Sequence, residues 1–159
     1  VIMPAVAVDA GLGELSRAGY LLSKGVGLNT RLAVVTTDLP MPVDPPARLG
    51  VQDFCAKCRK CAECCPADCI PTGGKIRVRG VEKWKIDEEQ CLLYWGRIGV
   101  ACTICQVVCP WSKPRSWWHR AIAEIAIRVP WSRRFLVWAD DLVYGRRHRR
   151  RATPAWLQR

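Results

Sequence analysis

The sequence predicts an α+β fold organised around two cysteine runs. All ten cysteines of the 159-residue chain lie between positions 55 and 109. Short candidate strands and candidate amphipathic helices flank these runs on both sides. The chain is long enough for one domain with a modest hydrophobic core.

The two runs have a spacing that is typical of iron–sulfur ligands. Residues 55–66 contain C-x2-C-x2-C-x3-C-P, and residues 91–110 repeat its C-x2-C-x3-C-P half, with Cys91 upstream of it. This spacing holds bacterial-type 4Fe–4S clusters. The register begins at Cys55, because a register beginning at Cys58 requires a cysteine where Asp68 stands.

Two-cluster ferredoxins cross their ligands, so that the last cysteine of each run binds the other cluster. We therefore expect two 4Fe–4S clusters with four cysteine ligands each. Cluster one takes Cys55, Cys58, Cys61 and Cys109, and cluster two takes Cys65, Cys91, Cys102 and Cys105. The remaining Cys64 and Cys69 are expected to be small buried residues. A zinc site leaves too many thiols unused, and the clustering of the cysteines disfavours a disulfide framework.

The positive charges near the first run have two interpretations. Lys57, Arg59 and Lys60 raise the reduction potential of cluster one if they face it, because they stabilise its more negative reduced form. Alternatively, they face solvent.

The N-terminal third is predicted to alternate strands with a helix. Residues 1–8 are apolar and suit a buried strand, and apolar spacing predicts a helix over 12–24. Between them, Gly11 and Gly13 either present backbone amides to a cofactor or phosphate, or make a tight turn. The β-branched residues 31–37 predict a strand.

Four prolines in residues 38–46 predict an extended connector into the cluster region. Between the runs, residues 75–79 alternate like one strand of a hairpin whose turn is Gly73-Gly74.

Two helices are predicted after the second run, over 117–128 and 132–144, with Ser116 and Ser132 as N-caps. The residues expected to face inward are Trp118, Ile122, Ile125 and Val129 on the first helix, and Phe135, Trp138 and Leu142 on the second. We expect these helices to pack against a larger body, because short amphipathic helices need a partner surface.

Charge and hydropathy restrict the possible partners. The formal net charge is +11, and residues 146–151 are its densest part. A basic tail is compatible with nucleic acid, an anionic membrane surface, an acidic partner or plain solvation. No nucleic-acid-binding motif is present, so nucleic acid is not expected. No apolar run approaches the length of a bilayer span. The start at Val1, without an initiator methionine, favours a fragment or a processed piece.

Residues along nearly the whole chain carry a family resemblance. The first run with Phe54, residues 84–87, and the Cys91-x3-Trp95-x3-Gly99 spacing resemble the C-terminal part of a reductive dehalogenase. Residues 11–17, 31–40 and 140–145, with Trp156, are similar to the segments that flank the clusters in that family.

The resemblance implies an enzyme with a cobalamin-type corrinoid and two 4Fe–4S clusters that replaces the halogen of an organohalide by hydrogen. It implies residues 1–50 as the last piece of a corrinoid-binding α/β domain, 51–113 as a ferredoxin-like module, and 114–159 as helices and a basic tail that pack back. It places Gly11, Gly13 and Thr37 near the corrinoid. Arg31 is then a candidate to stabilise the proton donor or the leaving halide, with a structural salt bridge as the alternative.

The resemblance also implies partners and a location. Family members usually sit on the outer face of the cytoplasmic membrane, held by a small anchor protein and supplied by an upstream electron donor, whereas some are cytoplasmic. This chain lacks the long N-terminal region that supplies most of the corrinoid pocket and the catalytic tyrosine. It also has Ser16 where the family usually has glycine.

Two rival functions remain. Epoxyqueuosine reductase also combines a corrinoid with two such clusters, and Cys109-Pro110-Trp111 suits it. However, the Cys91-x3-Trp95 spacing and residues 37–40 fit the dehalogenase better. A free two-cluster ferredoxin that only carries electrons is the second rival, but it does not require residues 1–50 or 115–159.

Overall fold

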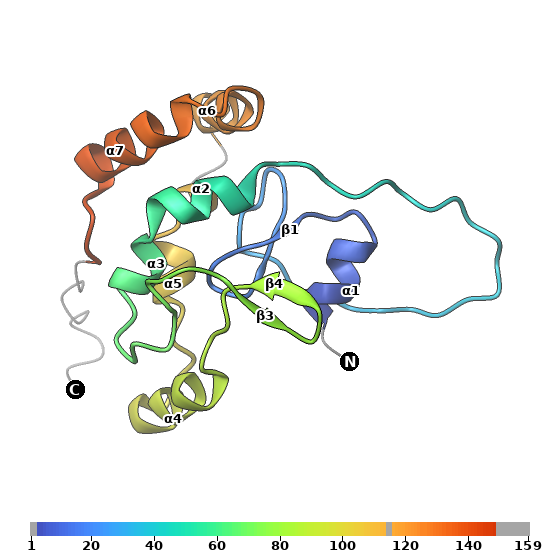
Figure 1. The fold of residues 1–159 in the computed structure, drawn as a ribbon, viewed down its shortest axis with the longest axis horizontal. Helices are drawn as coiled ribbons and strands as arrows, with labels where there is room; N and C mark the ends of the chain where they lie inside the picture. The colour runs from blue at the N-terminus through green and yellow to red at the C-terminus, as the bar shows by residue number, and fades with distance from the viewer. Residues whose placement is uncertain (1–2, 114–115, 149–159) are drawn as a thin grey trace, which may run out of the picture.

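A computed structural model describes residues 3–113 and 116–148 (Figure 1). Helices and two small antiparallel hairpins alternate along these residues, which confirms the predicted α+β class. The helices are α1 (Met3–Asp9), α2 (Val51–Cys58), α3 (Lys60–Glu63), α4 (Glu88–Ile98), α5 (Ile104–Val107), α6 (Trp117–Arg128) and α7 (Ser132–Tyr144), with a 3-10 turn η1 (Pro110–Ser112). The strands are β1 (Glu14–Leu15), β2 (Leu21–Leu22), β3 (Ile76–Val78) and β4 (Val81–Lys83).

The predicted N-terminal strand is wrong, because residues 3–9 form helix α1; residues 1 and 2 lie outside the described part. Pro4 sits in the first turn of α1, where its missing N–H is not needed for the helix. No described strand pairs with this segment. A helix satisfies its own backbone hydrogen bonds, which an unpaired strand cannot do.

The predicted helix over 12–24 is also wrong, because β1 and β2 form a hairpin there. Gly19 has a φ of 73° in the turn between the strands. A Cβ at Gly13 would lie only 2.2 Å from the carbonyl oxygen of Leu22. Glycine at position 13 therefore allows the close approach of β2, which the apolar helical spacing did not reveal.

Residues 31–37 do not form the predicted strand, because no other strand pairs with them. The expected connector over 38–46 likewise contains neither helix nor strand. Figure 1 shows the chain between β2 and α2 as a long open loop that swings away from the other elements. Val35 on this loop is 88% exposed, so its β-branched residues lack a packing partner among the described residues.

The strand predicted over 75–79 is confirmed as β3, but the predicted hairpin is wrong, because β3 pairs with the strand that follows it. β3 and β4 pair antiparallel, with Val78 opposite Val81. The turn is Arg79-Gly80, whose φ angles are 50° and 83°, rather than Gly73-Gly74. Two consecutive positive φ angles are typical of the turns that match the twist of a tight hairpin.

Helices α6 and α7 begin and end as predicted, but their buried faces differ. Phe135, Trp138 and Leu142 on α7 are 60%, 58% and 72% exposed. Ala126 of α6 and Val137 of α7 are buried instead, against Phe54 and Cys58 of α2. The expected N-caps are not made, since Ser116 hydroxyl contacts His119 and Ser132 hydroxyl donates to the Val129 carbonyl.

The main hydrophobic core joins the N-terminal hairpin to the cysteine runs. Its buried members come from the β1–β2 hairpin, the start of α2, α3 and the segment after it, and they are Ala18, Leu22, Leu28, Leu49, Val51, Ala62, Cys69 and Ile70. Cysteines of both runs pack against this core, namely Cys55, Cys61, Cys65, Cys91, Cys105 and Cys109. The fold therefore brings the two runs to one place. No helix of the described residues is long and apolar enough to cross a membrane.

Candidate iron–sulfur centre

Helix α2 carries the first two cysteines and is fixed by an acidic cap. The Glu14 carboxylate accepts hydrogen bonds from the backbone N–H groups of Gly50 and Val51, each at 2.9 Å. A negative charge that accepts from the first amides of a helix stabilises its N-terminus. Glu14 on β1 therefore holds the helix that positions Cys55 and Cys58.

A break in the backbone then redirects the third cysteine. Arg59 has a φ of 56°, so α2 ends at Cys58 and α3 begins at Lys60. Cys55 and Cys58 lie three residues apart on one face of α2, and the break turns Cys61 toward the same place.

All four cysteines predicted for cluster one line one small cavity, although Cys109 comes from the second run. The cavity is lined by Cys55, Cys58, Cys61 and Cys109, together with Arg17, Lys60 and Trp111. The charges agree with this grouping: burial raises the pKa of the Cys109 thiol, and the thiolates of Cys55, Cys58 and Cys61 raise it further.

The four cysteines predicted for cluster two form a second group. Burial raises the pKa of Cys105 to about 11, and the neighbouring thiolates of Cys102, Cys65 and Cys91 contribute. Cys91 lies in the first turn of α4, which begins where the Asp87 side chain accepts from the Gln90 N–H at 2.9 Å. The fold thus brings Cys65 of the first run together with the three cysteines of the second.

The two leftover cysteines behave differently. Cys69 is buried, as expected, and its Sγ lies 3.3 Å from Cys65 Sγ. Cys64 is only partly buried, contrary to expectation, and its thiol donates to the Arg146 carbonyl at 3.3 Å.

The chemistry of both groups fits thiolate-ligated clusters. Burial raises the pKa of Cys58 to about 12, so this thiol deprotonates only when a nearby positive centre compensates, as metal ligation does. The indole Nε1 of Trp111, beside the first group, is buried without a hydrogen-bond partner among the described residues. A cluster sulfur supplies an acceptor for such a donor. Within residues 3–113 and 116–148, no group of three His, Cys, Asp or Glu side chains is arranged to bind a single metal ion. The four cysteines of a 4Fe–4S cluster each bind a separate iron, so they are spaced more widely than the ligands of a single ion.

The three cations that the sequence places in the first run are held differently. Arg59 is exposed, whereas the side chain of Lys60 is only 1% exposed. Lys60 ammonium is ion-paired with Asp140 and lies 2.9 Å from Asp141 Oδ1, both on α7. Lys57 is directed elsewhere, at 2.5 Å from Asp53. Of the three cations considered from the sequence, Lys60 is thus the buried one.

Arg17 is a further buried cation, which sequence reasoning did not single out. It is 2% exposed, and its guanidinium donates to the carbonyls of Cys55 at 3.1 Å and Pro71 at 2.7 Å. It lies 4.4 Å from the centre of the Trp84 ring. Arg17 lies in the turn between β1 and β2, and a single arginine in a turn carries no sequence signal for a buried position.

The residues predicted near a corrinoid do not come together with the cysteines. Arg31 and Thr37 are exposed on the long loop, and Thr37 hydroxyl accepts from the Leu39 N–H at 3.1 Å. Gly11 and Gly13 lie in the turn before β1, where a Cβ at Gly11 would meet the Pro45 carbonyl oxygen at 2.6 Å. This crowding supports the tight-turn interpretation of the two glycines.

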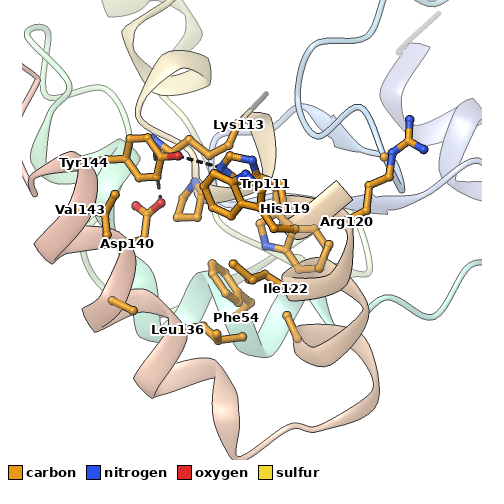
Figure 2. A pocket seen from close by; sticks show the side chains of 16 residues that line it. Phe54, Trp111, Lys113, His119, Arg120, Ile122, Leu136, Asp140, Val143 and Tyr144 are labelled. Atoms are coloured by element: carbon orange, nitrogen blue, oxygen red, sulfur yellow. Dashed lines mark hydrogen bonds and ion pairs between the residues drawn. The ribbon is translucent and has the colours of Figure 1, made fainter. Parts of the chain in front are cut away.

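A cavity of about 150 Å³ lies between α2, α6, α7 and η1, and the sequence did not indicate it. Figure 2 shows Tyr144, Lys113 and His119 gathered at one end, with Arg120 pointing away. His119 Nε2 lies 2.8 Å from the Tyr144 hydroxyl, and Lys113 Nζ lies 4.2 Å from the centre of the Tyr144 ring. The apolar walls include Phe54 and Leu136.

Comparisons with known proteins agree with this geometry. Residues 54–113 match the model of the 4Fe-4S dicluster domain. The chain is 38% identical over 136 residues to a tetrachloroethene reductive dehalogenase of Desulfitobacterium hafniense. This alignment covers 79% of this chain and 24% of that protein. A tetrachloroethene reductive dehalogenase of Sulfurospirillum multivorans is 34% identical over 160 residues, covering 96% of this chain and 32% of that protein.

A more distant match is the epoxyqueuosine reductase of Aliivibrio fischeri, 31% identical over 144 residues, which covers 87% of this chain and 36% of that protein. Among solved structures, a reductive dehalogenase described in connection with B12-dependent dehalogenation superposes with a TM-score of 0.86 at 40% identity. That match covers 92% of this chain and 22% of the other. In sequence and in fold, the chain is therefore a relative of the reductive dehalogenases, and it spans between 22% and 32% of the length of those compared above.

Proposed function

We propose that the chain is the electron-relay part of a reductive dehalogenase. In this proposal, residues 51–113 form the two-cluster module, residues 1–50 are the last piece of a corrinoid-binding domain, and residues 114–159 form the C-terminal helices and basic tail. The observation that carries the proposal is the sorting of eight cysteines into two groups, one that lines a single cavity and one gathered around Cys105, within a chain whose relatives are dehalogenases.

The proposed ligands are those of the crossed arrangement. Cys55, Cys58, Cys61 and Cys109 bind cluster one, and Cys65, Cys91, Cys102 and Cys105 bind cluster two. Support comes from the cavity lined by the first four and from the thiolates that surround Cys105. Cys105 also acts on the pKa of the Cys61 thiol, so the two groups are neighbours, as an electron relay requires.

A cobalamin-type corrinoid, when bound in the full-length protein, supplies the cleavage of the carbon–halogen bond. The overall reaction consumes two electrons and one proton, converts the carbon–halogen bond to a carbon–hydrogen bond, and releases halide. The residues of this chain hold the cluster thiolates, exclude water from the first group through Phe54, which is buried at its cavity, and pass electrons singly toward the corrinoid domain.

The segment before α2 is proposed to face that domain. Arg31 and Thr37 are exposed on it, which leaves both side chains available to a corrinoid domain. Replacing Arg31 by Gln in the full-length protein is expected to lower dehalogenation while the iron content stays unchanged. An unchanged rate assigns Arg31 a purely structural or solvent-facing role.

The enzymatic proposal is tested by expressing the full gene, loading corrinoid and clusters, and assaying halide release with reduced viologen as the electron source. The expected result is stoichiometric halide and dehalogenated product from an organohalide. A fully loaded protein that releases no halide from a panel of chlorinated and brominated alkenes and phenols contradicts the proposal.

One alternative is supported by a specific observation, the 31% identity to an epoxyqueuosine reductase. The same loaded protein is therefore offered tRNA that contains epoxyqueuosine. Conversion to queuosine without halide release favours this alternative. If the loaded protein exchanges electrons but neither releases halide nor converts epoxyqueuosine, the result favours a free two-cluster electron carrier.

We further propose that the full-length protein is peripheral on the outer face of the cytoplasmic membrane, held by an anchor protein and served by an upstream electron donor. This proposal rests on the location that the family resemblance implies. Fractionation with a membrane-impermeant protease tests the location: digestion in intact spheroplasts is expected, and protection there favours the cytoplasmic alternative.

A further inference from the structure

Arg17 is a buried cation whose hydrogen-bond acceptors are all neutral. Its guanidinium donates to the backbone carbonyls of Cys55, Pro71 and Gly73, at 3.1, 2.7 and 3.0 Å. No ion pair joins Arg17 to a carboxylate within the residues that the structure describes. Arg17 therefore contributes a net positive charge to the interior.

The site of this charge is the wall of the first cysteine group. Arg17 lines the same cavity as the four proposed ligands of cluster one, and it bonds to the carbonyl of Cys55, which is one of those ligands. The guanidinium also lies 4.4 Å from the centre of the Trp84 ring, which is 4% exposed. Packing on a buried aromatic ring and three carbonyls fixes the cation in this position.

The other buried cation at this cavity differs, because it is neutralised. Lys60 is ion-paired with both Asp140 and Asp141. Glu14 makes no ion pair with Arg17, and its carboxylate oxygens accept from the amides of the first turn of α2, although its charge opposes that of Arg17 at Cys55. Arg59 is a cation without a carboxylate partner as well, but it is exposed and screened by solvent.

The second cysteine group has no equivalent buried cation among the residues that the structure describes. The buried cations among those residues are Arg17, Lys60 and Arg133. Arg17 and Lys60 line the first cavity. Arg133 bonds to Asp53 and to the carbonyls of Ala126 and Ile127. The environments of the two proposed clusters are therefore asymmetric in charge.

We propose that Arg17 is a positioning residue that holds cluster one at a higher reduction potential than cluster two, so that an electron shared by the pair resides on cluster one. This inference rests on the proposed ligand sets. Reduction adds one negative charge to a cluster, and a fixed cation in a low-dielectric interior stabilises the reduced form. The same charge in water would be worth far less.

The test is a redox titration of the full chain, anaerobically reconstituted with iron and sulfide and followed by electron paramagnetic resonance. Cys102→Ser and Cys58→Ser variants assign the signal of each cluster. Arg17→Gln is expected to move the midpoint potential of cluster one to a more negative value and leave cluster two in place. Arg17→Lys, which keeps the charge, is expected to have a midpoint potential of cluster one close to that of the wild type. Arg59→Gln, which removes an exposed cation, is expected to shift the midpoint potential of cluster one much less than Arg17→Gln does.

The outcomes separate the inference from the function on which it rests. A wild-type chain that binds no iron contradicts both. A loaded wild-type chain whose Arg17→Gln variant shows no shift, or equal shifts in both clusters, overturns the inference alone. If Arg17→Gln does not retain cluster one, the midpoint potentials of the two clusters in the wild-type chain decide. A midpoint potential of cluster two at or above that of cluster one then overturns the inference.

Discussion

The carboxylate of Asp140 on α7 accepts a hydrogen bond from the buried ammonium of Lys60, which lies between two proposed cluster ligands. Desolvation alone would lower the pKa of Lys60, but the hydrogen bonds to Asp140 and Asp141 outweigh it and raise the pKa. This contact joins the C-terminal helix to the loop of cluster one. The helix therefore supports the position of Cys58 and Cys61 without supplying a ligand.

Removing this support is expected to destabilise the fold. Asp140→Asn leaves Lys60 with Asp141 as its remaining carboxylate, and we expect a loss of about 1–3 kcal/mol of unfolding free energy. Urea denaturation of the loaded protein measures it. Glu124→Gln, which removes only the surface pairs with Lys24 and Arg128, is the control and is expected to change nothing measurable. Equal stability of the two variants contradicts a structural role for the Lys60 pair.

The acidic cap of α2 gives a second prediction. Glu14→Gln removes the negative charge that faces the first amides of α2, and it is expected to cost about 1–2 kcal/mol. Hydrogen exchange of the amides of Gly50 and Val51 is expected to accelerate, while α7 is unaffected. Asp9→Asn is the matched control, because Asp9 is an exposed acid at the end of α1. Unchanged exchange at the start of α2 in Glu14→Gln would show that the cap is not needed.

The pH dependence of stability is predicted from His119. Burial lowers the pKa of His119 from its usual 6.5, with a contribution from Lys113. A histidine with a lowered pKa favours the folded state when it is neutral, so its contribution is present above pH 6.5 and is lost as the pH falls below that value. The difference in thermal midpoint between wild type and His119→Gln is therefore expected to shrink between pH 7.5 and pH 5.5. If this difference in thermal midpoint instead grows between pH 7.5 and pH 5.5, the pKa of His119 is raised by folding, which contradicts the environment described for His119.

The two leftover cysteines give a prediction that separates ligands from neighbours. Cys69→Ala and Cys64→Ala are expected to retain the full iron content, although Cys69 Sγ lies 3.3 Å from Cys65 Sγ. Iron and acid-labile sulfide assays measure this. A loss of half the iron in Cys69→Ala would place Cys69 in the ligand set of cluster two in place of a proposed cysteine.

The sequence was sufficient for some elements because their signals are local. The cysteine spacing predicted the four ligands of cluster one, which line one cavity, and the bounds of α6 and α7 are those predicted. The β1–β2 hairpin was missed because Gly13 and Gly19 act through close backbone approach and positive φ, which apolar periodicity does not report. The inward-facing residues of α7 were predicted wrongly, because Val137, rather than Phe135, packs against α2.

The charged residues around the cysteine groups were not predictable from local sequence. Arg17, Glu14 and Lys60 gain their roles from partners distant in sequence, such as Pro71 for Arg17 and Asp140 for Lys60. No spacing rule anticipates such pairs, since an isolated arginine or glutamate is most often solvated.

The crossed ligation of two clusters is the central claim, and serine variants of single cysteines test it most directly. The wild-type chain is expected to bind about eight irons, as two 4Fe–4S clusters require. Cys109→Ser and Cys55→Ser are expected to remove the same paramagnetic resonance signal, and Cys105→Ser the other. If Cys109→Ser instead removes the signal that Cys105→Ser removes, each run binds its own cluster and the account of the site is wrong.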